Sequence, residues 1–261
     1  MGVGWLYMVH SKVEKAMILA IDIGNSYTKI AVYEGKEVVR RELVHKTQSF
    51  DLENILSKYR IEKIAISTVG REVEIERQVE ASGIETRRLR RGMDLPFAND
   101  YRTPETLGLD RIAGMLGAWG AHEGAKDFLV MDLGTCNTYD MMIDGRYVGG
   151  NIAPGVEMRL RAMHEFTAKL PMISVEEADK AVEQMTDTIG GTTVEAMACG
   201  AIIGVRDEIE RIIDEFRKRT GDKGVCVVTG GYADVVVKRL KSDVEVNPYL
   251  VLDGLNFFAS N

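Results

Sequence analysis

Two short apolar runs, each ending in an Asp-x-Gly sequence, stand out along the chain. The first run covers 18–23 and contains Asp22, and the second covers 128–133 and contains Asp132. A turn and a second mostly apolar segment follow each run, at 28–33 and at 138–143. Short apolar runs bounded by turn residues are typical of buried strands, so each copy predicts a strand, a turn and a strand.

The two copies keep a constant spacing, because Asp22 and Asp132 are 110 residues apart, as are Gly24 and Gly134. A glycine in such a turn lets backbone N–H groups approach an anion, a following Asn, Ser or Thr can donate to phosphate oxygen, and the aspartate can hold a cation or its water. A single Asp-x-Gly is explained by an ordinary hairpin. The repeat, together with the glycine turn at 229–231, predicts that two facing hairpins grip the phosphates of one nucleotide.

The rest of the pattern predicts two α/β domains with a cleft between them. Strands are predicted at 38–44, 61–68, 85–89 and 225–228, helices at 51–59, 71–81, 109–119, 193–219 and 250–259, and a loop at 95–107. The order of strands, helix, strand and helix occurs twice, which predicts a first domain over 17–124 and a second over 125–261. Small residues recur four apart in two of the helices, as at Ala113 and Gly117, and permit close helix packing.

Composition and charge exclude several classes of protein. With 261 residues and 45% hydrophobic content the chain can bury a full core. Its net charge of −7 gives no broad positive field for nucleic acid, and the basic run at 87–91 is interpreted as a solvated face. Three cysteines without Cys-x-x-Cys spacing favour a reducing cytoplasm and argue against a zinc site or a disulfide framework.

Residues 1–16 form a separate segment. Its apolar patch at 3–9 is too short to cross a membrane, and it lacks the basic region and cleavage site of a signal peptide. We expect a poorly ordered extension. No other stretch approaches membrane-spanning length, so no membrane association is expected.

A phosphoryl transfer reaction also needs a positioned acceptor hydroxyl and usually a carboxylate that takes its proton. Asp110 is the best candidate, although a carboxylate at a predicted helix start is also an ordinary first-turn residue. Arg111 could bind a substrate carboxylate or form a surface ion pair. Tyr101 could line the same pocket or simply pack.

Taken together, these motifs resemble the type III pantothenate kinases of the acetate kinase, sugar kinase, Hsp70 and actin superfamily. The matching segments follow the family's order and are Asp22-Ile23-Gly24-Asn25-Ser26, Asn99-Asp100-Tyr101, Leu107-Gly108-Leu109-Asp110-Arg111, Asp132-Leu133-Gly134-Thr135, Gly149-Gly150-Asn151-Ile152-Ala153-Pro154-Gly155, Thr167-Ala168-Lys169-Leu170-Pro171 and Thr229-Gly230-Gly231. The resemblance covers nearly the whole chain from residue 17. It implies two duplicated ribonuclease H-like domains of the actin-like ATPase kind, with a nucleotide cleft between them.

The resemblance also implies an activity. Members of the family phosphorylate pantothenate to 4′-phosphopantothenate with ATP, the first step of coenzyme A synthesis. This implies Mg²⁺ with ATP, a monovalent cation (K⁺ or NH₄⁺) bound by Asp132, and a cytoplasmic homodimer whose substrate pocket lies near the interface.

Residue roles follow from the same resemblance. The first ATP loop would comprise Asp22, Ile23, Gly24, Asn25, Ser26, Tyr27, Thr28 and Lys29, and Thr135 would contact ATP from the second loop. Pantothenate would be held by Tyr101, Gly108, Leu109, Asp110, Arg111 and Thr193, with Asp110 as proton acceptor. The chain departs from the family pattern at Ser26, Cys136 and Thr192, and none of these changes removes a residue assigned to chemistry.

Two alternatives remain open. The protein could be a non-catalytic relative that binds nucleotide without turnover and regulates transcription or binds a protein. The presence of Asp110 and Arg111 argues against this alternative. A kinase of the same superfamily could act on a different small hydroxy acid, which a panel of hydroxy acids would reveal.

Overall fold

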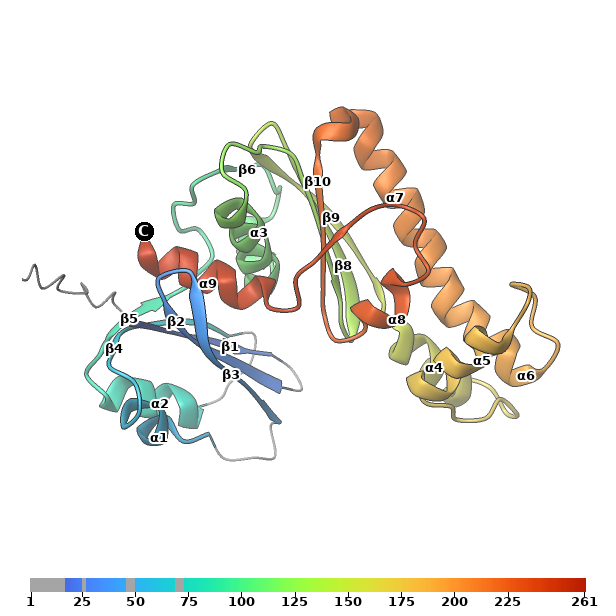
Figure 1. Ribbon diagram of the computed structural model, residues 1–261, viewed down its shortest axis with the longest axis horizontal. Helices are drawn as coiled ribbons and strands as arrows, with labels where there is room; N and C mark the ends of the chain where they lie inside the picture. Colours follow the sequence, from blue (N-terminus) through green and yellow to red (C-terminus); the bar gives the residue numbers. More distant parts are fainter. Residues whose placement is uncertain (1–16, 25–26, 46–49, 69–72) are drawn as a thin grey trace, which may run out of the picture.

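The computed structural model describes residues 17–24, 27–45, 50–68 and 73–261, and it contains two β-sheets with a helical layer between them (Figure 1). The extension predicted at 1–16 lies outside the described residues, as do Asn25 and Ser26.

The first sheet has five strands in the order β3-β2-β1-β4-β5. They are β1 (Met17–Ile23), β2 (Tyr27–Glu34), β3 (Glu37–His45), β4 (Ile61–Thr68) and β5 (Glu85–Arg88). β2 runs antiparallel to β1 and β3, whereas β4 runs parallel to β1 and β5. Every strand predicted in this half of the chain is confirmed.

The second sheet repeats this arrangement and adds one strand, in the order β11-β10-β7-β8-β9-β6. Its strands are β6 (Ala98–Asn99), β7 (Phe128–Leu133), β8 (Cys136–Ile143), β9 (Arg146–Pro154), β10 (Val225–Thr229) and β11 (Glu245–Val246). In this sheet, β7 corresponds to β1 and β8 to β2, whereas β9, β10 and β11 correspond to β3, β4 and β5. The parallel and antiparallel pairs are the same in both sheets. The duplication predicted from two motifs therefore extends to both sheets. The short β6 comes from the predicted loop at 95–107 and pairs with β9.

The helices lie on the faces of the sheets. They are α1 (Leu52–Leu56), α2 (Val73–Ala81), α3 (Leu109–Ala121), α4 (Val156–Glu165), α5 (Val175–Gln184), α6 (Thr193–Ala198), α7 (Gly204–Thr220), α8 (Ala233–Val237) and α9 (Leu250–Ser260). The helix predicted at 193–219 is present as α6, a π-helical segment (Cys199–Ile203) and α7. The sequence pattern did not predict α4, α5 or α8.

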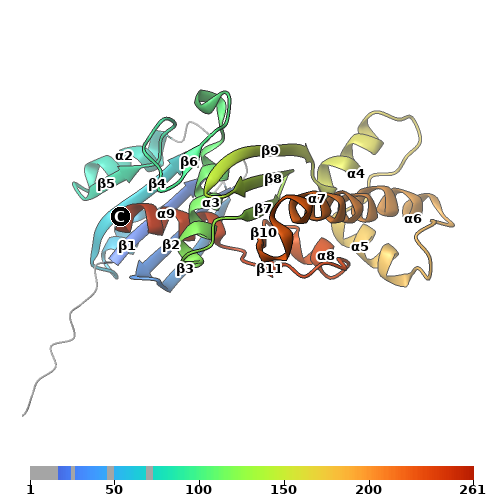
Figure 2. The ribbon, with the colours of Figure 1, turned by 90° about the horizontal axis from the view of Figure 1, so that it is seen from above.

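Alternating strand residues build three cores. In β1, Leu19 and Ile21 pack against α1 and α2, whereas Ile18 and Ala20 face α3 and α9. In β7, Phe128 and Val130 face the same α3 and α9 layer, while the intervening residues pack against α4 to α8. The layer of α3 and α9 is thus shared by both sheets, as Figures 1 and 2 show.

The shared layer is held together by a very close helix approach. A methyl group at Gly254 of α9 would collide with the carbonyl of Ala113, and one at Gly117 would collide with the carbonyl of Leu250. The predicted close packing of small residues is confirmed for α3, whose partner is α9 of the same chain. It is wrong for the second helix, where a methyl group at Gly200 would meet no atom within 4 Å. Among the described residues, no helix is long and apolar enough to cross a membrane.

Candidate active site

Strand alternation aims two carboxylates at the shared layer. Asp22 continues the face of β1 that carries Ile18 and Ala20, and Asp132 continues the face of β7 that carries Val130. Both faces meet α3, whose second residue is Asp110. Three carboxylates that are far apart in the sequence therefore lie around the N-terminal end of one helix.

At this proximity the charges of the three carboxylates act on one another. Burial raises the pKa of Asp132 to about 6; the charge of Lys29 opposes this shift, and the charges of Asp110 and Asp22 add to it. Burial also raises the pKa of Asp22, while Ser67 and Lys29 lower it and Asp110 raises it. The charge of Lys29 therefore acts on the aspartates of both hairpins.

Asp22 has a partner that the sequence did not reveal. The hydroxyl of Ser67 donates a hydrogen bond of 2.6 Å to Oδ1 of Asp22, and both side chains are buried. Parallel pairing of β4 with β1 puts the two residues side by side. Sequence reasoning identified the strand at 61–68 but had no signal for its register against β1.

The two hairpins differ by one residue in register. Asp22 lies opposite Lys29 in the first, whereas Asp132 lies opposite Thr138 in the second. An exact repeat with a spacing of 110 would have put residue 139 opposite Asp132. The first carboxylate therefore faces a cationic partner and the second a hydroxyl, so the two loops are not chemically equivalent.

The glycine turn at 229–231 lies directly against the second hairpin. Thr229 is paired with Asp132, and the backbone N–H of Tyr232 donates to the carbonyl of Leu133 at 2.9 Å. Gly230 has φ +101°, and a Cβ there would lie 2.5 Å from Oδ1 of Asp132. Only glycine fits this close, left-handed position.

Asp110 lies in the first turn of α3, after the N-cap residue Gly108. Its Oδ1 accepts the backbone N–H of Arg111 at 2.9 Å, which leaves Oδ2 for another partner. A small cavity borders it and is lined by Asp110, Arg111, Gly114, Val130, Asp132, Thr138, Asp140, Thr229 and Val251. Asp110 therefore accepts a backbone hydrogen bond in the first turn of α3 and also lines the cavity beside Asp132.

Arg111 is buried and does not form a surface ion pair. Its Nε and Nη2 donate to Oδ1 of Asp140 at 2.9 and 2.6 Å, and the hydroxyl of Tyr147 donates to the same oxygen at 2.5 Å. The guanidinium carbon lies 5.6 Å from the ring centre of Tyr101, which is held nearby by the pairing of β6 with β9. Sequence reasoning missed Asp140 and Tyr147.

Thr135 and Thr193 are less closely tied to this cluster. Thr135 is exposed in the turn after β7, where its carbonyl accepts the N–H of Gly155 at 3.1 Å. Thr193 is exposed at the start of α6, which packs against α4 and α5 at the end of the molecule opposite α9 (Figure 1). The single chain does not bring Thr193 to the cavity beside Asp110.

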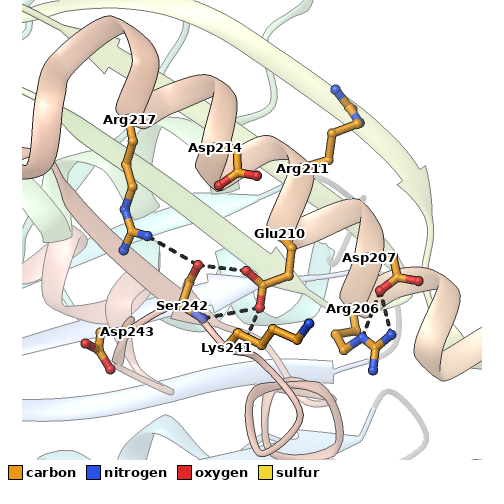
Figure 3. Close-up of a pocket in the computed structure, with 9 residues that line it drawn as sticks. All are labelled: Arg206, Asp207, Glu210, Arg211, Asp214, Arg217, Lys241, Ser242 and Asp243. Carbon is orange, nitrogen blue, oxygen red and sulfur yellow. Dashed lines mark hydrogen bonds and ion pairs between the residues drawn. The ribbon is translucent and has the colours of Figure 1, made fainter. Parts of the chain in front are cut away.

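A charged groove lies elsewhere, between α7 and the segment 241–243 (Figure 3). Glu210 accepts the N–H and the hydroxyl of Ser242 at 3.2 and 2.7 Å, and Arg206 pairs with Asp207 at 2.7 Å. Because these charged groups mainly satisfy one another, the groove holds the segment 241–243 against α7.

Asp132 has hydroxyl-bearing neighbours on both adjacent strands. Within the described part of the chain, no group of three His, Cys, Asp or Glu side chains is arranged to hold a metal ion. Asp132 supplies one carboxylate, and the hydroxyl-bearing Thr138 and Thr229 pair with it.

Comparison of the sequence with known proteins gives a consistent family. The family described as Type III pantothenate kinase matches residues 18–215. A Type III pantothenate kinase of Christiangramia forsetii is 34% identical over 245 residues, covering 92% of this chain and 97% of that protein. One from Bacteroides fragilis is 37% identical over 244 residues, covering 92% and 96%.

Comparison of the fold adds more distant structures. A conserved putative Baf family transcriptional activator from Campylobacter jejuni superposes with a TM-score of 0.58 at 18% identity, covering 91% of this chain and 94% of that one. A putative N-acetylmannosamine kinase from Listeria monocytogenes gives 0.53 at 16% identity, covering 93% and 98%. At these identities the likeness shows the fold, which is that of two duplicated ribonuclease H-like domains.

Proposed function

The chain belongs to the type III pantothenate kinase family, and on this premise we propose that it phosphorylates the primary hydroxyl of pantothenate with ATP, using Asp110 as general base. This reaction is the first step of coenzyme A synthesis. The observation that carries the proposal is the convergence of Asp22, Asp132 and Asp110 on one layer, where Asp110 and Asp132 line the same small cavity. We further propose that the protein is cytoplasmic.

The acceptor step follows from the position of Asp110. The primary hydroxyl of pantothenate would lie against Asp110, which accepts its proton as the hydroxyl oxygen attacks the γ-phosphorus and ADP leaves. Arg111, Tyr101, Gly108 and Leu109 would surround the substrate. The direct contact of Arg111 with Asp140 fixes its guanidinium before the substrate arrives.

ATP would span the two hairpins. The loop from Asp22 to Lys29 would hold its phosphates on one side, and Thr135 would do so on the other. The turn at Gly230 brings backbone beside Asp132, leaving Gly231 with open space where an adenosine could rest. Mg²⁺ would enter together with ATP, whose phosphates would supply part of its ligands.

A monovalent cation would bind to Asp132. Such an ion would neutralise charge between the carboxylates and the phosphate chain. The hydroxyl-bearing residues Thr138 and Thr229, which lie beside Asp132 on the neighbouring strands, would add oxygen ligands for K⁺ or NH₄⁺.

We expect K⁺ to stabilise the protein in a pH-dependent way. Because the pKa of Asp132 is raised from 3.8 to about 6, ionisation of this carboxylate destabilises the folded state. The loss of stability grows as pH rises from 3.8 and is complete above about 6. K⁺ offsets this cost only when the carboxylate is ionised. The midpoint of thermal unfolding should therefore rise with K⁺, compared with tetramethylammonium at equal ionic strength, at pH 7.5 and hardly at pH 5.

Asp132→Asn provides the control for this prediction. The variant should lose the K⁺ effect at pH 7.5, which would separate Asp132 from Asp22, whose pKa is also raised. An equal K⁺ effect at pH 5 and pH 7.5 would contradict the assignment of the cation to Asp132.

A homodimer would explain the position of Thr193. Because α6 lies far from α3 within one chain (Figure 1), we propose that Thr193 of one subunit completes the acceptor pocket of the other. Thr192 and Glu195 form a capping box that fixes the start of α6 and thereby the Thr193 backbone.

A mixture of two inactive variants tests this arrangement. Thr193→Ala and Asp110→Asn should each be poorly active, but refolded together they should recover roughly a quarter of wild-type activity, since half of the dimers are mixed and each has one intact pocket. A mixture as inactive as its components would contradict a shared pocket.

The function itself is tested by product mass. The purified protein, Mg-ATP, K⁺ and pantothenate should yield 4′-phosphopantothenate, with a panel of other small hydroxy acids run alongside. Faster turnover of another acid would replace pantothenate as substrate, and ATP binding without any turnover would favour a non-catalytic role.

A further inference from the structure

Asp140 is a buried carboxylate with an unusual division of its hydrogen bonds. It lies on β8 opposite Val130 and is 1% exposed. Oδ1 accepts all of its bonds, two from Arg111 and one from Tyr147, at 2.5 to 2.9 Å. Oδ2 is equally buried and has no hydrogen-bond partner among the described residues.

Structural stabilisation does not account for this geometry. A guanidinium and a carboxylate usually pair through two parallel bonds, one to each oxygen, because that satisfies both. Here both Arg111 bonds converge on one oxygen, and Asp140 lines the small cavity together with Asp110 and Thr138. A buried carboxylate oxygen without a donor costs folding free energy, so a ligand group that donates a hydrogen bond to it would be bound favourably.

The cavity has the size and polarity for a hydroxyl group. It holds about one water-sized group, and its polar lining includes the carboxylates Asp110 and Asp140. Next to Oδ2 of Asp140, the guanidinium of Arg111 supplies N–H donors. Its positive charge is balanced by the Asp140 carboxylate through Oδ1. The pair therefore presents an acceptor next to a donor, which complements a ligand group that carries a hydroxyl next to a carbonyl.

Pantothenate contains such a group, because its secondary hydroxyl lies on the carbon attached to the amide carbonyl. We propose that Asp140 is a specificity-determining residue, whose Oδ2 accepts a hydrogen bond from this secondary hydroxyl while Oδ1 holds Arg111 for the neighbouring carbonyl. This inference rests on the proposed function and deepens it. It assigns the primary hydroxyl to Asp110 and the secondary hydroxyl to Asp140.

The decisive experiment compares pantothenate with an analogue in which hydrogen replaces the secondary hydroxyl. For the wild-type protein, kcat/KM should favour pantothenate by about 100-fold or more, because a buried acceptor is left unpaired by the analogue. Asp140→Asn should lower kcat/KM for pantothenate at least about tenfold and change that for the analogue little, so that the preference collapses. A purely structural role would lower both values equally and keep the preference.

Two further variants complete the test. Asp179→Asn removes a carboxylate of α5 that pairs with Lys238 and Arg239 away from the cavity, and it should keep the full preference. Tyr147→Phe removes one of the bonds that hold Oδ1, so the preference should fall several-fold; if Asp140→Asn does not fold, this variant decides.

The outcomes separate the two proposals. An active wild-type protein that shows no preference, or an Asp140→Asn variant that keeps it, would overturn the role of Asp140 alone. A wild-type protein that does not phosphorylate pantothenate would overturn the proposed function, and the role of Asp140 with it.

Discussion

Replacement of Asp110 by asparagine is expected to lower kcat by about 10²-fold or more, because asparagine cannot accept the proton of the attacking hydroxyl. Folding should be preserved. Oδ1 of Asp110 accepts the backbone N–H of Arg111, and asparagine has the same oxygen. The first turn of α3 therefore keeps this hydrogen bond. Steady-state kinetics and thermal unfolding of the same samples would check both parts.

A matched control lies in the same region of the chain. Asp100 is partly exposed and pairs with Arg146 at 2.6 Å in the loop that precedes α3. Asp100→Asn should lose this surface ion pair with little change in kcat, since exposed pairs contribute little. A fully active Asp110→Asn variant would remove Asp110 from the mechanism and leave it as a helix-end residue.

Much of the fold could be predicted from the sequence, because strand periodicity and the repeat carry strong local signals. The runs containing Asp22 and Asp132 fix two buried strands, and their repetition predicts two similar domains. The alternation of side chains along each strand then decides on which face of the sheet each carboxylate lies. The same reasoning located Asp110 at a helix start, and the structure confirms that this helix lies between the sheets.

What the sequence could not supply was the register between elements far apart in the chain. Ser67 meets Asp22 only through the pairing of β4 with β1, and Asp140 meets Arg111 only because β8 faces α3. The difference of one residue between the hairpins is likewise invisible in a constant spacing of 110. Such contacts depend on tertiary packing, which local patterns do not encode.

The domain boundary predicted between residues 124 and 125 stays a prediction. A single cut point in the sequence describes this chain incompletely. The C-terminal helix α9 packs against β1 and α3, whereas β6 pairs with β9 of the second sheet. Each half of the sequence thus contributes an element to the other half. The helix α3, which carries Asp110, therefore packs against an element from the other end of the chain.

The substitution Gly230→Ala is expected to reduce activity at least about tenfold and to lower the free energy of unfolding by about 2–4 kcal/mol. The added methyl would lie 2.5 Å from Oδ1 of Asp132 and from backbone atoms of Leu133, and the φ of +101° is unfavourable for alanine. The turn would have to move away from the second hairpin, and with it the backbone that we place beside the nucleotide.

Gly231→Ala is the matched control for this prediction, because the same methyl one residue later meets no atom within 4 Å. This variant should fold with wild-type stability. If adenosine lies against this backbone, as we propose, the methyl should raise the KM for ATP and leave that for pantothenate unchanged. Kinetics with each substrate varied, together with urea unfolding, would separate the two effects. Equal unfolding free energies for the two variants would contradict the packing argument, and an unchanged KM for ATP in Gly231→Ala would place the adenosine elsewhere.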